Sequence, residues 1–300
     1  FFMIFALIIL PVIAIADRGG LSIVLEQLKA LHPRFIDPFA LSVGTAIGFL
    51  GIGLGSPGNP HIIARYMSID DPEQLRFSAV VGTVWNVLMA WGALFIGLAG
   101  RVYFPEVSLL PGSDTENLYP VLAQQHLHPV LFGIVVASIF AAIMSTADSQ
   151  LLVAASGIVR DIYEKIIHKG AQIEQKQLVL YSRLSVFLLV VFALLLGMLA
   201  SELVFWLVLF AWAGLGASLG PTSILALYWK GTTRAGIFAG LLTGTVVTIL
   251  WYNIPYLKNS MYELVPAFVL SFVAVLAISK FTRAPEGIDT LFRAMKTGKH

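Results

Sequence analysis

A cluster of helix-breaking residues inside an apolar segment constrains this chain more than any other feature. Four glycines and two prolines lie between Gly51 and Pro60, in a segment from 38 to 69 that otherwise has the composition of a membrane-spanning helix. In a helix interior, Gly costs about 1 kcal/mol and Pro about 3 kcal/mol relative to Ala. Backbone groups freed by a break find no water in lipid, so a break persists only where protein or a wet cavity covers it. The stretch predicts an unwound point in a substrate or ion site, the alternative being a Pro-kinked packing helix.

The composition indicates a membrane protein. Of the 300 residues, 58% are hydrophobic and 12% are charged, whereas a soluble domain has about a quarter of its residues charged. The chain has no Cys, which excludes disulfides and thiolate metal sites. The net charge is +2 and the basic residues flank the apolar segments, so we expect no nucleic-acid partner. Phe1 opens directly in an apolar run without a starting Met, which indicates a piece of a longer protein.

Eight apolar segments are candidates for spanning helices, each of which needs about 20 residues. We expect helices over residues 1–16, 38–69, 77–100, 128–155, 179–200, 203–229, 235–253 and 262–280. The fold class is therefore an all-α membrane protein. Between these segments we expect a polar, partly amphipathic loop at 17–37, a loop with a turn at 112–114, and an interfacial helix at 158–168.

The loop charges predict an orientation, because cytoplasmic loops carry the excess of Lys and Arg. Alternate loops form two sets, and one set holds fourteen of the 19 Lys and Arg residues. That set includes the C-terminal tail, so both ends of the chain are expected to face the cytoplasm.

A second informative stretch runs from Ser138 to Ser149. Ala142, Ser145 and Thr146 are spaced i, i+3 and i+4, so they share one face of a helix. Their two hydroxyls and one carbonyl are oxygen ligands of the kind that hard cations take. The spacing suggests a site for a monovalent ion, and the alternative is that the hydroxyls bond back to their own helix.

Other polar residues in apolar segments have two possible roles each. Asp148 takes part in cation release, or is a carboxylate at a wet helix end. Trp212 lies among small residues at 211–222 and lines a cavity or packs against neighbours. His61 is interpreted as a hydrogen-bonded structural residue, because no second metal ligand lies at metal spacing. The chain has no paired carboxylates, nucleophile elbow or phosphate loop, so we do not expect an enzyme.

Three blocks of sequence resemble the sodium/solute symporter family, closest to its bacterial sodium/proline symporters. The blocks are GNPHIIARYM at 58–67, AAIMST at 141–146 with QLL at 150–152, and AWAG at 211–214 continuing to Gly-Pro at 220–221. They occur in family order and the resemblance covers nearly the whole chain.

The resemblance implies a partial five-plus-five inverted-repeat fold within a single transmembrane domain over 1–300. Residues 1–16 would be the last helix of the first repeat, and 38–229 the second repeat. Residues 235–280 would be peripheral helices, and 281–300 a cytoplasmic tail.

The resemblance also implies a sodium site and a solute site. The positions that match family sodium ligands are Ala142, Ser145 and Thr146, which would act with backbone oxygens of a helix that precedes this chain. Sodium would be the coupling ion, and no cofactor is expected.

The implied solute-binding positions are Ile52, Ser56, Asn59, Pro60 and Trp212. In sodium/proline symporters a Trp and a Tyr of the broken helix stand where this chain has Ile52 and Ser56, and Gln is more usual than Asn59. Pro60 is retained. The resemblance is thus specific to the family and only suggestive of proline.

The sequence accordingly predicts a sodium-coupled symporter in the cell membrane that imports a small organic solute, with proline or another amino acid as candidates. Its partners would be sodium, the solute and membrane lipid. The alternative is a membrane sensor built on the transporter scaffold, which binds the solute and signals.

Overall fold

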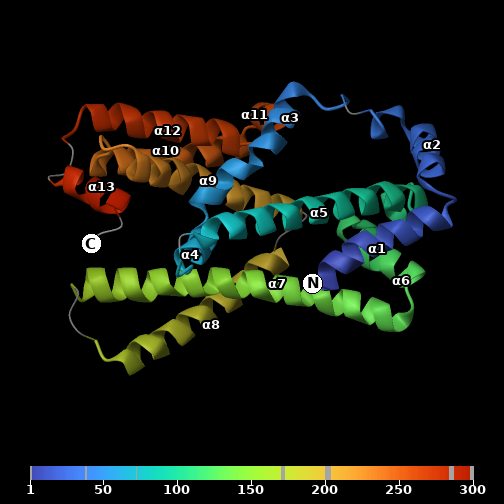
Figure 1. The fold of residues 1–300 in the computed structure, drawn as a ribbon, viewed down its shortest axis with the longest axis horizontal. Coiled ribbons are helices and arrows are strands. Elements are labelled where there is room, and N and C mark those ends of the chain that lie inside the picture. Colours follow the sequence, from blue (N-terminus) through green and yellow to red (C-terminus); the bar gives the residue numbers. More distant parts are fainter. Residues whose placement is uncertain are drawn as a thin grey trace. The chain divides into compact units, whose positions relative to one another are not determined.

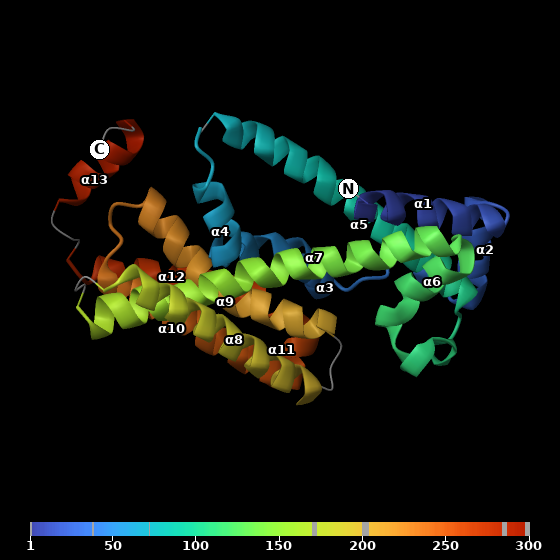
Figure 2. The ribbon, with the colours of Figure 1, turned by 90° about the horizontal axis from the view of Figure 1, so that it is seen from below.

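A computed structural model of the chain describes residues 2–37, 39–71, 73–169, 173–199, 204–283 and 287–297. All regular structure in these ranges is helical, which confirms the all-α class (Figures 1 and 2). The helices form two compact units. Unit 1 comprises Phe1–Ala40 and Ile69–Ala200, and unit 2 comprises Leu41–Ser68 and Ser201–His300.

Unit 1 is built from long apolar helices and one helical loop. Its elements are α1 (Phe2–Asp17), α2 (Leu21–Leu31), η1 (Pro33–Phe35), α5 (Gln74–Tyr103), η3 (Val107–Leu109), η4 (Pro111–Ser113), η5 (Thr115–Asn117), α6 (Leu118–His126), α7 (Pro129–Ser156), η6 (Gly157–Ile167) and α8 (Gln175–Leu199). The expected turn at 112–114 is present, because Gly112 has a φ of 66° and interrupts η4.

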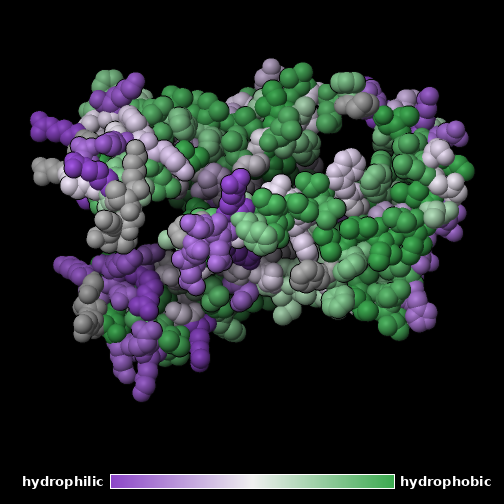
Figure 3. Space-filling view, in the orientation of Figure 1, coloured by the Kyte–Doolittle hydropathy of each residue, from purple (hydrophilic) through white to green (hydrophobic). Residues whose placement is uncertain are grey.

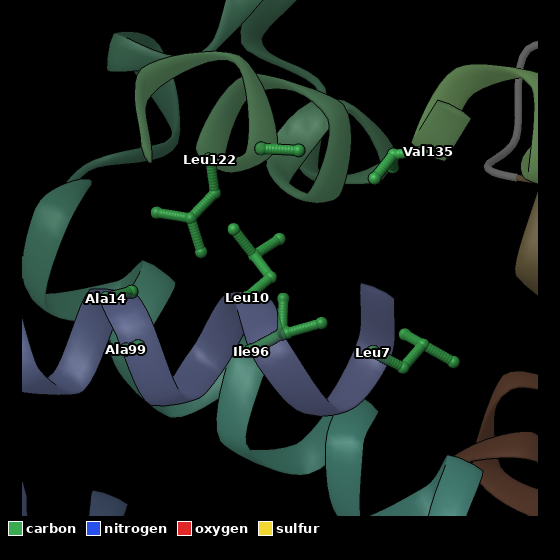
Figure 4. Packing of buried hydrophobic residues seen from close by; sticks show 8 residues of the cluster. Leu7, Leu10, Ala14, Ile96, Ala99, Leu122 and Val135 are labelled. Atoms are coloured by element: carbon green, nitrogen blue, oxygen red, sulfur yellow. The ribbon is translucent and has the colours of Figure 1, made fainter. Parts of the chain in front are cut away.

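The core of unit 1 lies where α1 crosses α5, α6 and α7. Leu10 and Ala14 of α1 are fully buried, and they pack with Ala99 of α5 and Leu122 of α6. Figure 4 shows these side chains pointing toward one another between the helices. Burying one such Leu contributes about 1.5–3 kcal/mol. This cluster fixes α1, α5 and the start of α7 around one another.

The segment at 17–37, expected as a loop, contains the helix α2, which bends by 79° from α1. Gly19 and Gly20 make the bend, with φ values of 91° and 110° that favour glycine. The amphipathic pattern of the segment is the reason for the helix, because Val24 and Leu28 bury one face against α5.

The helix expected at 158–168 is present as the helical segment η6, and its interfacial position stays a prediction. The chain continues from α7 into the π-helical segment η6 without a break, because Gly157 keeps helical dihedrals of −58° and −44°. Ion pairs Arg160–Glu164 and Lys165–Asp161 line η6. Figure 3 shows hydrophilic residues gathered at this end of unit 1, while apolar residues cover α1 and α5.

Unit 2 packs the interrupted helix against two apolar helices, and a third apolar helix packs on those two. Its elements are α3 (Val43–Leu50), η2 (Gly51–Gly58), α4 (Pro60–Met67), α9 (Val204–Tyr228), α10 (Arg234–Asn253), α11 (Pro255–Ser260), α12 (Leu264–Lys280) and α13 (Ile288–Thr297). The core consists of Ala213 and Ala217 of α9 with Leu264, Ala267 and Phe268 of α12. The segment 281–300, expected as a cytoplasmic tail, contains α13, in which Phe292 is buried and Asp289 pairs with Lys230.

A row of glycines lets α10 lie close to α9 and α12. Gly236, Gly240 and Gly244 are four residues apart on α10 and all are buried. A Cβ at Gly244 would overlap the backbone of α9 at Ala217, and one at Gly240 would overlap Val275 of α12. Small residues at this spacing let membrane helices approach closely. This row was not predicted above, although its Gly-xxx-Gly-xxx-Gly pattern is readable in the sequence.

Helices occur at all eight segments expected to span the membrane. In the described residues five helices are long and apolar enough to cross it, or six if the bent α1–α2 pair is one span. Two further apolar helices, Val43–Gly58 and Leu264–Lys280, are shorter than a full span.

Candidate functional site

The predicted break at 51–60 is present in unit 2 and has a definite geometry. The helix α3 ends at Leu50 and continues as the 3₁₀ segment η2, and α4 begins at Pro60. Asn59, between η2 and α4, has an extended backbone with φ −96° and ψ 109°. Pro60 takes the first position of α4, where its missing N–H is not needed. The chain thus tightens into a 3₁₀ helix and then breaks at Asn59, so the predicted unwound point is a single residue.

The glycines of η2 are needed because α9 lies directly against them. A Cβ at Gly55 would overlap the indole of Trp212, and one at Gly58 would overlap the backbone at Gly216. Gly53, in contrast, has no neighbour within 4 Å of its Cβ position. Two of these glycines therefore serve close packing, whereas Gly53 faces open space.

Two side chains satisfy carbonyl groups in the interrupted segment. The Nδ2 of Asn59, a residue only 2% exposed, donates to the carbonyl of Gly55 at 2.8 Å. The Nε1 of Trp212 donates to the carbonyl of Ile52 at 2.9 Å. A buried carbonyl without a partner is costly, so these bonds stabilise the break. Both residues have a structural role, and their role in solute binding stays a prediction.

Ile52 and Ser56 do not share a face. Residues four apart share a face of an α-helix, but a 3₁₀ helix has three residues per turn, so they differ by about 120° in η2. Ile52 lines a cavity of about 200 Å³ within unit 2, and Ser56 is not among its lining residues. Pro60 is half-buried at the start of α4. The two implied solute-binding positions in η2 therefore point in different directions.

The three candidate sodium ligands lie together on α7, within unit 1. They line a cavity of about 420 Å³ whose walls come from α1, α5 and α7. Its lining residues are Phe2, Met3, Trp85, Met89, Ser138, Ala141, Ala142, Ser145 and Thr146. The spacing predicted a common face, and the structure shows that this face borders an open volume.

The hydroxyl of Thr146 donates to the carbonyl of Ala142 at 3.2 Å. This is the back-bonding that was the alternative interpretation, and it is compatible with ion binding. A hydroxyl that donates its one hydrogen keeps acceptor lone pairs, and a carbonyl has two lone pairs. Thr146 and Ser145 are both exposed. The arrangement offers a pair of adjacent oxygens to a cation.

Ser138 was missed as part of this surface. It lies four residues before Ala142 and lines the same cavity, and its hydroxyl donates to the carbonyl of Val135 at 2.7 Å. The signal was in the sequence, because Ser138 and Ser145 are two helical turns apart. Trp85 and Met89 of α5 could not be found from the sequence, since only the packing of α5 on α1 brings them here.

The structure places Asp148 away from a helix end, and it gives His61 no role as a metal ligand. Asp148 is exposed on α7, and the helix continues through η6 to Ile167, so it does not lie at a helix end. His61 is half-buried in the first turn of α4. Among the described residues no three His, Asp or Glu side chains are grouped as metal ligands would be.

These features define a helical membrane protein that crosses the bilayer several times. Such proteins build solute and ion sites at interrupted helices and at oxygen-bearing faces of intact ones. Unit 2 carries the interrupted helix, and unit 1 carries the oxygen-bearing face on α7.

The chain belongs to the sodium:solute symporter family, whose family model matches residues 1–244. This confirms the resemblance described from the sequence. It also places the chain among membrane transporters and not among enzymes, as expected.

Curated relatives include bacterial proline transporters. The chain is 34% identical to the osmoregulated proline transporter OpuE of Bacillus subtilis over 285 residues, which cover 94% of this chain and 57% of that protein. It is 35% identical to the high-affinity proline transporter PutP of the same species, covering 94% and 59%. It is 35% identical to a sodium/proline symporter of Staphylococcus aureus, covering 94% and 57%. The chain thus spans less than two thirds of the length of these relatives.

Proposed function

We propose that this chain is part of a sodium-coupled symporter that imports a small zwitterionic solute, with proline as the first candidate. Family membership and the printed names of the relatives support this proposal. The alternative of a solute sensor has no observation in its favour. Sodium, the solute and membrane lipid are the proposed partners.

One observation carries the sodium part of the proposal. The carbonyl of Ala142 and the hydroxyl of Thr146 lie 3.2 Å apart on a helix face that borders a cavity. Uncharged oxygens suit a monovalent cation, because the weak field must release the ion after each cycle. Ser145 is proposed as the third ligand, and Asp148, further along α7, as a residue that assists release.

The solute part rests on unit 2. We propose that Ile52, Ser56, Asn59, Pro60 and Trp212 surround or support the solute site at the break. Ile52 reaches the 200 Å³ cavity, and Asn59 and Trp212 hold the backbone of the break in place. Since the sodium ligands are in unit 1, coupling is a free energy shared between two distinct sites and must be reciprocal.

Uptake of labelled proline by the full-length protein in liposomes tests the proposal. We expect uptake driven by an inward sodium gradient and absent with potassium or choline in its place. Counterflow with a panel of labelled amino acids then ranks the solutes. Sodium-independent uptake, or no uptake of any amino acid, would contradict the proposal.

We further propose that residues 38–229 form the second inverted repeat and that the C-terminus is cytoplasmic. The split of Lys and Arg between alternate loops supports this orientation. These 300 residues contain no Cys, so single substitutions are informative. Ser113→Cys should react with an impermeant reagent from outside, and Glu174→Cys only after permeabilisation. The reverse pattern would invert the proposed orientation.

A further inference from the structure

One end of unit 2 gathers basic side chains from three segments. They are the loop between α9 and α10, the end of α12, and the segment that contains α13 (Figure 1). We name this surface the basic end, and it comprises residues 229–234 and 280–300. Its sequence includes seven Lys or Arg residues and only two Asp or Glu residues. The basic end therefore carries a strong net positive charge.

Contacts between the three segments hold the basic end together. The backbone N–H of Thr233, in the loop, donates to the Oγ of Ser279 on α12 at 3.2 Å. The hydroxyls of Thr233 and Thr282 share a hydrogen bond of 2.6 Å. Lys230, also in the loop, forms an ion pair with Asp289 of α13. Charges that are far apart in the sequence are therefore held on one surface.

Three cations of the basic end are available to an anion from outside the chain. Arg234, Lys280 and Arg283 are exposed, and none of them belongs to an ion pair within the described ranges. The carboxylate of Asp289 is already paired with Lys230. Guanidinium and ammonium groups form their strongest hydrogen bonds with carboxylate or phosphate oxygens. A partner that carries phosphate groups would therefore match this surface.

The helix α13 adds an apolar stripe to the basic end. Ile288, Leu291, Phe292 and Met295 follow the spacing i, i+3, i+4 and i+7, so they lie on one face of α13. Phe292 is buried, whereas Leu291 and Met295 are 60% and 54% exposed. The stripe is thus only partly covered by the chain. An amphipathic helix with basic residues beside its apolar face is suited to the surface of a membrane.

Exposed aromatic side chains indicate the depth at which the basic end lies. Tyr228 is the last residue of α9, a helix long enough to span the membrane, and it is 82% exposed. Phe281 directly follows α12 and is 88% exposed. Aromatic residues at the ends of spanning helices lie at the level of the lipid headgroups. The exposed Lys280, next to Phe281, is therefore at the level of the lipid phosphates.

We propose that the basic end binds the headgroups of anionic lipids such as phosphatidylglycerol, with α13 lying in the membrane interface. Arg234, Lys280 and Arg283 face the lipid phosphates, and Leu291 and Met295 reach the first part of the acyl chains. A soluble acidic protein matches the charges but not the exposed apolar groups at the ends of membrane helices, so lipid is the favoured partner. Clusters of basic residues next to spanning helices are typical of such recognition. The inference involves neither sodium nor the transported solute.

Quenching of a fluorophore on α13 by brominated lipid tests this surface directly. The full-length protein carries Met295→Cys labelled with bimane, with any native cysteine outside these residues replaced by serine. It is placed in phosphatidylcholine nanodiscs that contain increasing fractions of phosphatidylglycerol brominated on its acyl chains. Brominated phosphatidylglycerol should quench at a lower fraction than brominated phosphatidylcholine does, and concentrated salt should weaken this preference because it screens exposed charges. Equal quenching by the two lipids would overturn the proposal.

Charge removal gives a second readout with a matched control. Lys280→Gln with Arg283→Gln, added to the labelled protein, should raise the fraction of phosphatidylglycerol for half-quenching by at least about fivefold, because each basic residue near an anionic surface contributes binding of that order. Lys29→Gln with Arg34→Gln removes one Lys and one Arg from unit 1 and should leave that fraction unchanged. All four residues are exposed, so neither pair of substitutions should prevent folding.

The remaining outcomes also decide the proposal. If the two pairs of substitutions weaken quenching alike, net charge and not the basic end attracts the lipid, and the assignment is overturned. If bimane on α13 stays unquenched and water-exposed at every fraction of phosphatidylglycerol, α13 does not lie in the membrane interface and is accessible to a soluble partner instead. The assay measures no uptake, so each of these results leaves the proposed sodium-coupled symport as it stands.

Discussion

The broken helix of unit 2 and the α7 face of unit 1 arrange backbone and polar side chains in opposite ways. In unit 2 the donor groups of Asn59 and Trp212 are committed to carbonyls of η2, and glycines are pressed against α9. On α7 the helix is intact, and the oxygens of Thr146 and Ala142 border a cavity. The comparison shows that the break is a rigid, closely packed element. The oxygens on the α7 face, in contrast, keep lone pairs that can accept further contacts. Substitutions should therefore affect stability in unit 2 and ion affinity in unit 1.

The largest effect is expected for Gly58→Val. A side chain at Gly58 would overlap the backbone at Gly216, and backbone cannot rotate away. Overpacking typically costs about 1–3 kcal/mol, and more where nothing can yield. We expect little folded protein in detergent, measured by size-exclusion yield and thermal melting. Gly53→Ala in the same segment is the control and should behave like the parent, because Gly53 has open space. Equal melting of the two variants would contradict the close packing of η2 on α9.

Asn59→Ala should have the next largest effect. It leaves the buried carbonyl of Gly55 without its donor, which costs about 1–3 kcal/mol. Asn86→Ala removes the same bond, Nδ2 to the carbonyl four residues earlier at Gly82, on the exposed surface of α5. Thermal melting should fall clearly for Asn59→Ala and little for Asn86→Ala. If both variants melt alike, burial of the break does not matter to stability.

Thr146→Ala should change sodium dependence more than stability. The site has few other oxygens that could replace the lost ligand. The sodium concentration for half-maximal uptake should therefore rise by about tenfold, which corresponds to a loss of ~1.4 kcal/mol in binding free energy. Solute affinity at low sodium should fall too, and high sodium should restore it, because coupling is reciprocal.

Thr83→Ala is the matched control for Thr146→Ala. Thr83 makes the same back-bond, to the carbonyl of Ala79 at 2.8 Å, and lies outside the cavity. Its sodium curve should overlay that of the parent when corrected for inserted protein. A Thr146→Ala curve that also overlays the parent would show that this hydroxyl only bonds to its helix.

The smallest effect is expected at the wall of the cavity of about 200 Å³ in unit 2 that Ile52 lines. Ile52→Trp should narrow the cavity and change the KM for proline a few-fold relative to a smaller amino acid, because one extra group in a pocket discriminates weakly. Ser56→Tyr, on a different face of η2, should not reproduce that change. Sodium dependence should persist in both variants. If the two substitutions shift solute ranking alike, the two positions act on a common surface after all.

The sequence predicted the helices well because hydropathy and helix breakers are local properties. The apolar runs locate α7 and α9, and the cluster of Gly and Pro residues locates the break. The direction in which Ile52 points could not be predicted in the same way. It depends on η2 being a 3₁₀ helix, and η2 lies against α9. The course of the chain after Ser156 likewise depended on whether Gly157 would stay helical.

The candidate sites show the same division. The common face of Ala142, Ser145 and Thr146 follows from helical spacing alone, and the structure contains it. The partners on α5, and the residues that line the cavity beside Ile52, come from segments far apart in the sequence. These contacts cannot be predicted from local sequence, because they depend on which helices pack together.

The glycine row of α10 has a mechanical consequence. Side chains between two helices form a compressible layer that lets one helix slide by a rotamer change, and this layer is missing where Gly244 meets the backbone of α9 at Ala217. The Oγ of Ser271 on α12 also donates to the carbonyl of Gly240 at 2.9 Å, which pins the two helices in register. Any tilt of α12 must therefore carry α10 and α9 with it. Within unit 2, α9, α10 and α12 are therefore expected to move together as one rigid group.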